Sequence, residues 1–102
     1  MILKNGPSEI LMWRSEDGLA HFNIDQKIIR HSPTGMEFSY SGSGPADLAL
    51  NILFLYLDEE TAIKYYQEFK QEFISTMPKA GGRITAHQIL DFIKNEIFCS
   101  KR

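Results

Sequence analysis

Residues 41–57 have the sequence SGSGPADLALNILFLYL, and this stretch decides the fold. Small residues lead into a proline, and an almost uninterrupted apolar run follows. Pro45 suits the first position of an α-helix, because the amide hydrogen that it lacks has no intrahelical partner there and its φ is already helical. Ser43 or Gly44 would then be the N-cap, where a hydroxyl or a bare backbone can satisfy the first amides.

The apolar run itself is almost free of polar residues. Between residues 48 and 57 only Asn51 is clearly polar. A helix that is apolar on nearly every face has to be covered on several sides. The sequence therefore predicts a central, buried helix over about 45–57.

The bulk properties are those of a small globular protein. The chain has 102 residues, 43% of them hydrophobic and 24% charged, so we expect one domain spanning 1–102 rather than disorder. A formal net charge of −2 gives no overall field for nucleic acid or an anionic membrane. The single cysteine, Cys99, excludes a disulfide framework within the chain. No signal-like segment is present and the longest apolar run is too short for a bilayer span, so we expect a cytoplasmic protein.

The N-terminal part, residues 1–41, shows strand and turn patterns. Alternating apolar residues and Asp-Gly or Pro-x-Gly turn signals predict an antiparallel β-meander of three to five strands. The expected strands are 1–3, 9–14, 19–24, 27–31 and 36–40.

The C-terminal part, residues 45–98, is predicted to be helical. After the central helix, Asp58 is a suitable N-cap for a second helix that runs to about residue 76. Thr85 and Gln88 have the spacing of a capping box before a third helix over 86–98. Residues 83–84 add a brief extended segment. Segregated strands and helices predict an α+β fold.

A family resemblance rests on residues 31–50, which read HSPTGMEFSYSGSGPADLAL. This stretch resembles the signature of a small uncharacterised family, a domain of unknown function found in bacteria, phages and plasmids. Its members carry a His-Ser-Pro-x-Gly turn, an aromatic strand, a Gly-Ser-Gly-Pro-Ala loop and a Leu-Ala-Leu helix. The likeness extends over about 27–93. It implies a shared fold and a shared site around the loop, in a protein of phage or mobile-element type, and brings no established activity.

The loop at 41–46 is the candidate binding site. Exposed amides at a helix N-terminus attract anions, and serines add hydroxyl donors. A nucleotide or another anionic small molecule could bind there, with three basic residues as a cationic lid. Alternatively, the glycines only let strand and helix meet tightly, and the serines only cap. The candidate residues are Ser41, Gly42, Ser43, Gly44, Ala46, Arg30, His31 and Arg83.

No catalytic constellation is recognisable. The spacing around 41–46 is neither that of a P-loop nor that of a dinucleotide fingerprint. His21, His31 and His87 do not have the spacing of a metal site, and nothing indicates a cofactor. We therefore expect a non-enzymatic binding module that forms a homo-oligomer. The alternative is a protein–protein adaptor or inhibitor that uses the sheet edge and the face bearing Trp13, with the loop structural only.

Overall fold

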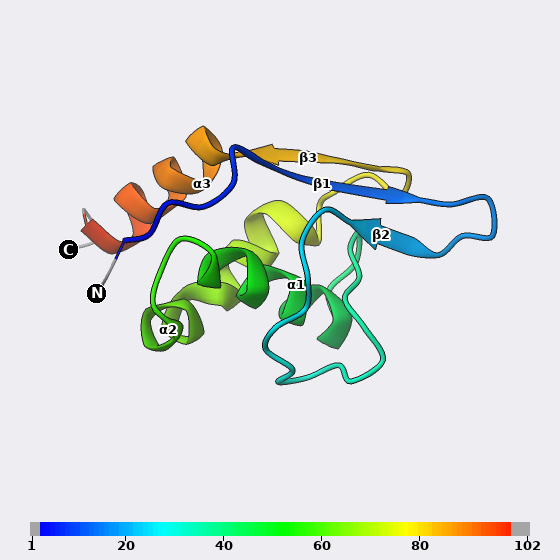
Figure 1. Ribbon diagram of the computed structural model, residues 1–102, viewed down its shortest axis with the longest axis horizontal. Coiled ribbons are helices and arrows are strands. Elements are labelled where there is room, and N and C mark those ends of the chain that lie inside the picture. Colours follow the sequence, from blue (N-terminus) through cyan, green and yellow to red (C-terminus); the bar gives the residue numbers. More distant parts are fainter. Residues whose placement is uncertain (1–2, 99–102) are drawn as a thin grey trace.

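The computed structural model describes residues 3–98 and shows a small sheet packed on helices (Figure 1). The α+β class and the three predicted helices are confirmed. The helices α2 and α3 each continue into a π-helical turn, named η1 and η2. The elements are β1 (Glu9–Arg14), β2 (Ala20–Phe22), α1 (Ser43–Phe54), α2 (Glu59–Phe69), η1 (Lys70–Ile74), β3 (Gly81–Thr85), α3 (Ala86–Ile93) and η2 (Lys94–Phe98).

The sheet is antiparallel, with the strand order β2-β1-β3. The predicted strands at 9–14 and 19–24 are present, and they pair Trp13 with His21. The third strand is β3, which pairs Arg83 with Leu11 and extends the brief segment expected at 83–84. Of the strand expected at 1–3, residues 1 and 2 lie outside the described chain, and Leu3 forms an isolated bridge with Leu57.

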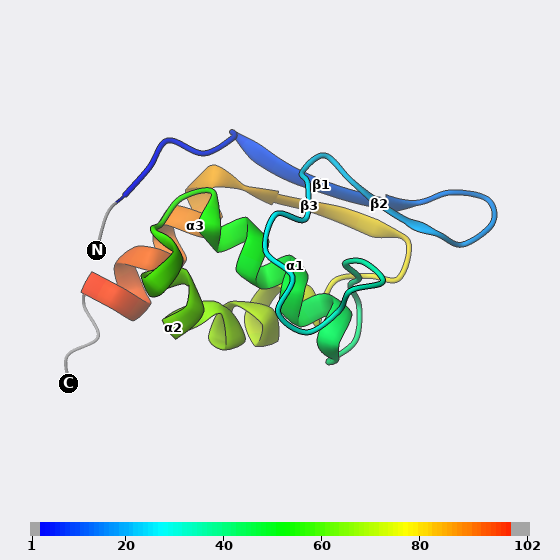
Figure 2. The same ribbon diagram turned by 60° about the horizontal axis from the view of Figure 1, so that its bottom comes forward.

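The strands predicted at 27–31 and 36–40 are wrong. Both segments are irregular, and the chain from 23 to 42 forms a long loop beside α1 (Figure 2). Polar side chains of α1 take up the backbone groups that a hairpin would have paired. The Asn51 side-chain oxygen accepts the amide hydrogens of Lys27 and Ile28 at 2.7 and 2.9 Å, and its nitrogen donates to the Ile28 carbonyl at 2.9 Å.

The central helix is confirmed, with shifted ends. Every residue of α1 from Gly44 to Leu53 is buried, and the helix packs against α2 and η1. It begins at Ser43 with Gly42 as N-cap, so Pro45 is the third helical residue rather than the first. The prediction of Ser43 or Gly44 as N-cap was therefore wrong, although the first turn that contains the proline was placed correctly.

The other two helix starts agree with the sequence. The Asp58 carboxylate accepts the amide hydrogen of Thr61 at 3.2 Å and caps α2. Thr85 and Gln88 form the predicted capping box at the start of α3. These caps fix where the chain enters each helix.

The helices α1 and α2 lie on the same side of the sheet (Figure 2). Ile10, Met12 and Ile84 on the inner side are buried in the core, whereas Trp13 on the outer side is 45% exposed. None of the helices in the described chain is long and apolar enough to cross a membrane. Cys99 lies outside the described residues.

Candidate functional site

The start of α1, where the loop at 41–46 was expected to bind an anion, has glycine as its N-cap and no side-chain cap among the described residues. Gly42 is extended, and its carbonyl accepts the amide hydrogen of Ala46 at 3.0 Å. Within the described residues no side chain caps this helix, and its first turn contains no acidic residue. The first amides of α1 thus lack the side-chain acceptor that α2 and α3 have, and of these three helices only α2 has acidic residues in its first turn to balance the dipole.

The glycines of this loop allow close packing. A Cβ on Gly44 would lie 2.8 Å from the Cβ of Glu37, and one on Gly42 would lie 2.6 Å from the ring of Tyr40. Both distances are too short for a real side chain. Close approach of Glu37 to the helix start therefore accounts for Gly44, whereas the half-exposed Tyr40 ring beside Gly42 could turn aside.

Two of the three basic residues of the expected lid, Arg83 and His31, have side-chain contacts elsewhere, whereas Arg30 is exposed and makes its contact through its backbone amide. Arg83 lies in β3, where its guanidinium pairs with Glu9 at 3.2 Å. The His31 ring is hydrogen-bonded to the Tyr66 hydroxyl on α2. The backbone amides of Arg30 and His31 point at α1 rather than at a ligand. These contacts bring neither Arg83 nor His31 to the loop at 41–46.

The amides near His31 bind a carboxylate of the protein itself. Asp47 is fully buried in α1 and accepts the amide hydrogens of Arg30, His31 and Ser32 at 3.1, 3.1 and 2.9 Å. The Gln26 side chain donates to the same carboxylate at 3.1 Å. Successive amides of this kind form an anion-binding nest. Sequence reasoning missed this role, although an aspartate four residues before Asn51 on a buried helix was the available signal.

An open depression lies beside the start of α1. It has a volume of about 540 Å³ and is lined by residues of the β1–β2 hairpin, of the 37–40 segment and of the loop before β3. Two of the lining residues, Glu37 and Tyr40, are those that pack against Gly44 and Gly42. The lining residues are Arg14, Gly18, Glu37, Ser39, Tyr40 and Lys79.

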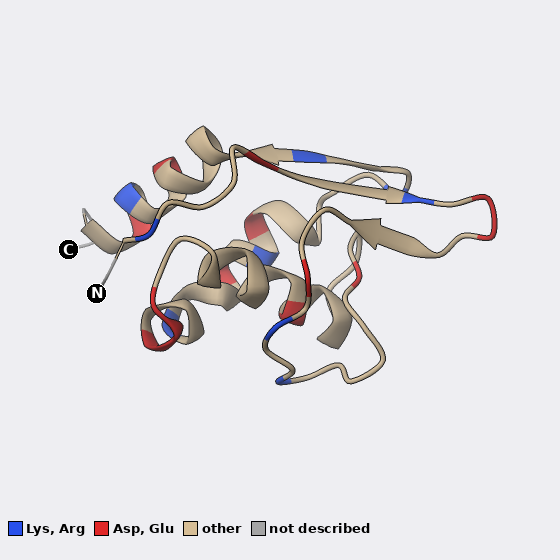
Figure 3. Cartoon of the chain, in the orientation of Figure 1, with Lys and Arg blue, Asp and Glu red and all other residues tan. Residues whose placement is uncertain are grey.

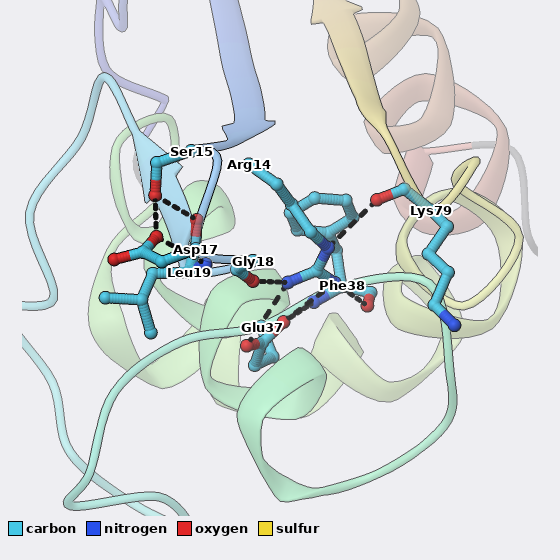
Figure 4. Close-up of polar contacts among 8 residues, drawn as sticks. All are labelled: Arg14, Ser15, Asp17, Gly18, Leu19, Glu37, Phe38 and Lys79. Carbon is cyan, nitrogen blue, oxygen red and sulfur yellow. Dashed lines mark hydrogen bonds and ion pairs between the residues drawn. The ribbon is translucent and has the colours of Figure 1, made fainter.

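Arg14 holds the walls of this depression together (Figure 4). Its Nε donates to the Lys79 carbonyl at 2.9 Å and a terminal nitrogen donates to the Gly18 carbonyl at 3.2 Å. Its guanidinium forms an ion pair with Glu37 at 3.1 Å and lies over the ring of Phe38, 4.3 Å from the centroid. The charges of Arg14 and Glu37 therefore compensate each other.

Three other residues of the depression are candidates to contact a ligand. Lys79 is exposed, and its side chain extends away from Arg14 in Figure 4. Tyr40 is 50% exposed. Ser39 has a φ of +74°, an uncommon conformation for a residue other than glycine, and its amide donates to the Ile74 carbonyl at 3.0 Å. Strained backbone of this kind concentrates at functional sites.

The hairpin turn next to the depression contains a serine–histidine contact that is not a nucleophile–base pair. The Ser15 hydroxyl donates its one hydrogen to Asp17, so His21 Nε2, at 2.9 Å, has to be the donor to Ser15. The hydrogen bond from Ser15 holds the pKa of the Asp17 carboxyl below its usual value, and the Leu19 amide lowers that pKa further. The arrangement stabilises the turn and leaves no base for Ser15.

Within residues 3–98 no group of three or more His, Cys, Asp and Glu side chains is arranged to hold a metal ion. The fold and the site thus define an α+β protein in which a long loop is anchored on a buried helix, next to an uncapped helix start. The chain belongs to DUF6166, a family of unknown function, and the match covers residues 8–95. Membership of an uncharacterised family, expected from residues 31–50, is confirmed. Neither the curated proteins nor the solved structures gave a match.

Proposed function

We propose that this protein is a non-enzymatic binding module for an anionic small molecule, with nucleotides as the first class to test. The ligand would lie at the start of α1 and in the depression beside it. The observation that carries the proposal is that the three helices differ in whether a side chain caps the N-terminus. A side chain caps α2 and α3, whereas α1 presents an uncapped N-terminus next to an open depression. Helix N-termini of this kind favour anions.

The depression supplies what a nucleotide needs besides the helix start. Its volume of about 540 Å³ is in the range of small-molecule sites. Lys79 offers a positive charge, and the exposed ring of Tyr40 offers a surface on which a base can stack. Glu37 would repel an anion if it were free, but Arg14 compensates its charge.

The residues proposed to contact the ligand are revised accordingly. Ser41, Gly42, Ser43 and Gly44 stay in the set, because they form the helix start. Ser39, Tyr40 and Lys79, which line the depression, replace the three basic residues: the side chains of His31 and Arg83 have other partners, and Arg30 is not among the lining residues. Ala46 leaves the set because its amide donates to the Gly42 carbonyl.

The proposal is tested by isothermal titration calorimetry with mononucleotides, dinucleotides, cyclic dinucleotides and inorganic phosphate. We expect saturable binding of at least one nucleotide, weakened about tenfold by Lys79→Gln. Lys27→Gln is the matched control, because Lys27 is also exposed but lies outside the depression. Binding of no compound, or equal weakening by both substitutions, would contradict the proposal. Gly44→Val is a poorer test, since its clash with Glu37 would perturb the fold itself.

A second candidate function is a protein–protein adaptor or inhibitor that uses the outer face of the sheet. The observation in its favour is that Trp13, stacked on His21 with ring centroids 5.9 Å apart, is exposed on the outer side of the sheet, and that Leu19, just before β2, is exposed as well. The same face could form the proposed homo-oligomer. Sedimentation velocity and co-purification of wild type and Trp13→Ala would detect either kind of association. For either candidate function we also propose a cytoplasmic location and a phage or mobile-element origin.

A further inference from the structure

A separate groove lies between η1 and the continuous helix formed by α3 and η2. It has a volume of about 290 Å³. Glu72 and Phe73 line it from η1, Asp91 and Phe92 from α3, and Glu96 from η2. No residue of the depression proposed above belongs to this groove. It therefore offers a second, independent surface.

The groove is acidic at its rim. Glu72, Asp91 and Glu96 come from three different elements, and no lysine or arginine is among the lining residues. The ion pairs found in the described chain, Arg14–Glu37 and Arg83–Glu9, involve none of these three carboxylates. Figure 3 shows acidic positions on α3 and on the helix formed by α2 and η1. A cation entering the groove would meet carboxylates that have no ion-pair partner among residues 3–98.

The groove has an aromatic floor. Phe73 is partly exposed and packs against Phe69 and Phe92, with ring centroids 4.8 and 6.2 Å away. A planar cation can stack on such rings while its N–H groups reach carboxylates at the rim. Arginine does both, because its guanidinium is planar and presents a fork of donors, whereas a lysine ammonium is a strongly hydrated point charge.

Both walls of the groove contain π-helical turns. In η1 the amide of Ser75 donates to the carbonyl of Lys70, five residues earlier, at 2.9 Å, which is the π-helical pattern. Glu72 and Phe73 lie inside this turn. Glu96 lies inside η2. π-helical turns are rare and are often found at functional sites, so two of them bordering one groove support a role for it.

We propose that this groove docks an arginine side chain of a partner protein. The guanidinium packs on Phe73 and forms ion pairs with Glu72 and Asp91, and Glu96 adds to the negative potential. Charge complementarity and the aromatic floor together determine the class of partner: a segment with an accessible arginine. This inference goes beyond the proposed function, because it uses a different surface and a ligand of opposite charge.

The test is a ¹⁵N–¹H NMR titration with the acetylated, amidated peptide Gly-Ala-Arg-Ala-Gly and its lysine and norleucine versions. We expect the arginine peptide to shift the amide resonances of η1, α3 and η2. The lysine peptide should bind at least about threefold more weakly, and the norleucine peptide should cause no shifts. The nucleotide titration reports on the other surface, so failure of one proposal leaves the other standing.

A charge-matched pair of variants locates the binding. Glu72→Gln with Asp91→Asn should weaken the arginine peptide about tenfold, whereas Glu16→Gln with Asp25→Asn removes the same charge from exposed positions elsewhere and should change affinity less than about twofold. Well-dispersed spectra of both variants establish that they are folded. Shifts spread over the whole surface, equal weakening by the two pairs, or no shifts with the arginine peptide would overturn the proposal.

Discussion

The carboxylate of Asp47 lies 2.9 Å from the backbone nitrogen of Ser32, a residue 15 positions earlier in the chain. This contact fastens the long loop to the buried helix α1. Asn51, one turn later, donates to the backbone carbonyl of Asp47 at 2.8 Å and binds the same loop at Lys27 and Ile28. Two polar residues of an otherwise apolar helix thereby hold a loop in place without a strand partner.

Replacing Asp47 should therefore be costly. In Asp47→Ala the amides of Arg30, His31 and Ser32 lose the fully buried carboxylate that they share as an acceptor, and we expect a loss of about 3 kcal/mol in the free energy of unfolding. Urea unfolding measures this loss, and amide hydrogen exchange should accelerate first at 30–32. Asp91→Asn, on an exposed position, should change stability by less than about 0.5 kcal/mol. A loss below about 1 kcal/mol in Asp47→Ala would contradict this role for the carboxylate.

Local patterns in the sequence predicted the elements whose causes are local. The apolar run after Pro45, the Asp58 cap and the capping box of Thr85 and Gln88 each depend on neighbouring residues, and the structure contains all of them. The hairpin at 27–40 was wrong, because its alternating pattern and turn signal are equally satisfied by a loop whose backbone groups bind Asp47 and Asn51. That choice depends on contacts 15 to 24 residues apart.

The candidate site was predictable to a similar extent. The helix start at 42–44 followed from the small residues and the proline. The positions of Arg83 and His31 did not, because they depend on the pairing of β3 with β1 and on the packing of α2 against the loop. The role of Arg14 also escaped detection, since its partners Gly18, Glu37 and Lys79 are brought together only by the complete fold.

Gly44 should not tolerate even a methyl group. A Cβ there would lie 2.8 Å from the Cβ of Glu37 and 3.3 Å from its backbone nitrogen, so the 37–40 segment would have to move away from α1. We expect Gly44→Ala to destabilise the protein by about 1–3 kcal/mol, as overpacked positions do. The neighbouring exposed Ser43 is the control, and Ser43→Ala should have a much smaller effect in the same thermal or urea unfolding experiment. Unchanged stability of Gly44→Ala would show that the helix start is less tightly packed.

Alkaline pH should destabilise the protein through Tyr56. Burial raises the pKa of this phenol above its usual 10.0, and its hydroxyl donates to the Pro7 carbonyl. The unfolded chain therefore loses the proton at a lower pH than the folded protein. The stability contributed by Tyr56 is complete below pH 10.0 and is lost as the pH rises from there through the folded pKa.

Urea unfolding at several pH values between about 8 and 11 measures this effect. Tyr56→Phe should unfold with a shallower decline above pH 10.0, and at neutral pH it should lose about 1 kcal/mol with the hydrogen bond to Pro7. Tyr40→Phe is the control, because it removes a half-exposed hydroxyl and leaves the buried Tyr56 in place. Identical profiles for Tyr56→Phe and wild type would contradict the assignment.

Arg14 should not be replaceable by lysine. Its guanidinium donates to the carbonyls of Lys79 and Gly18 and pairs with Glu37, and a single ammonium group cannot reach all of these acceptors. We expect Arg14→Gln to cost about 2 kcal/mol and Arg14→Lys to recover less than half of that cost. A double-mutant cycle with Glu37→Gln measures the coupling between the two charges, which should be about 1 kcal/mol. If lysine restored full stability, the positive charge alone would be enough, and the walls of the depression would not depend on the geometry of the arginine.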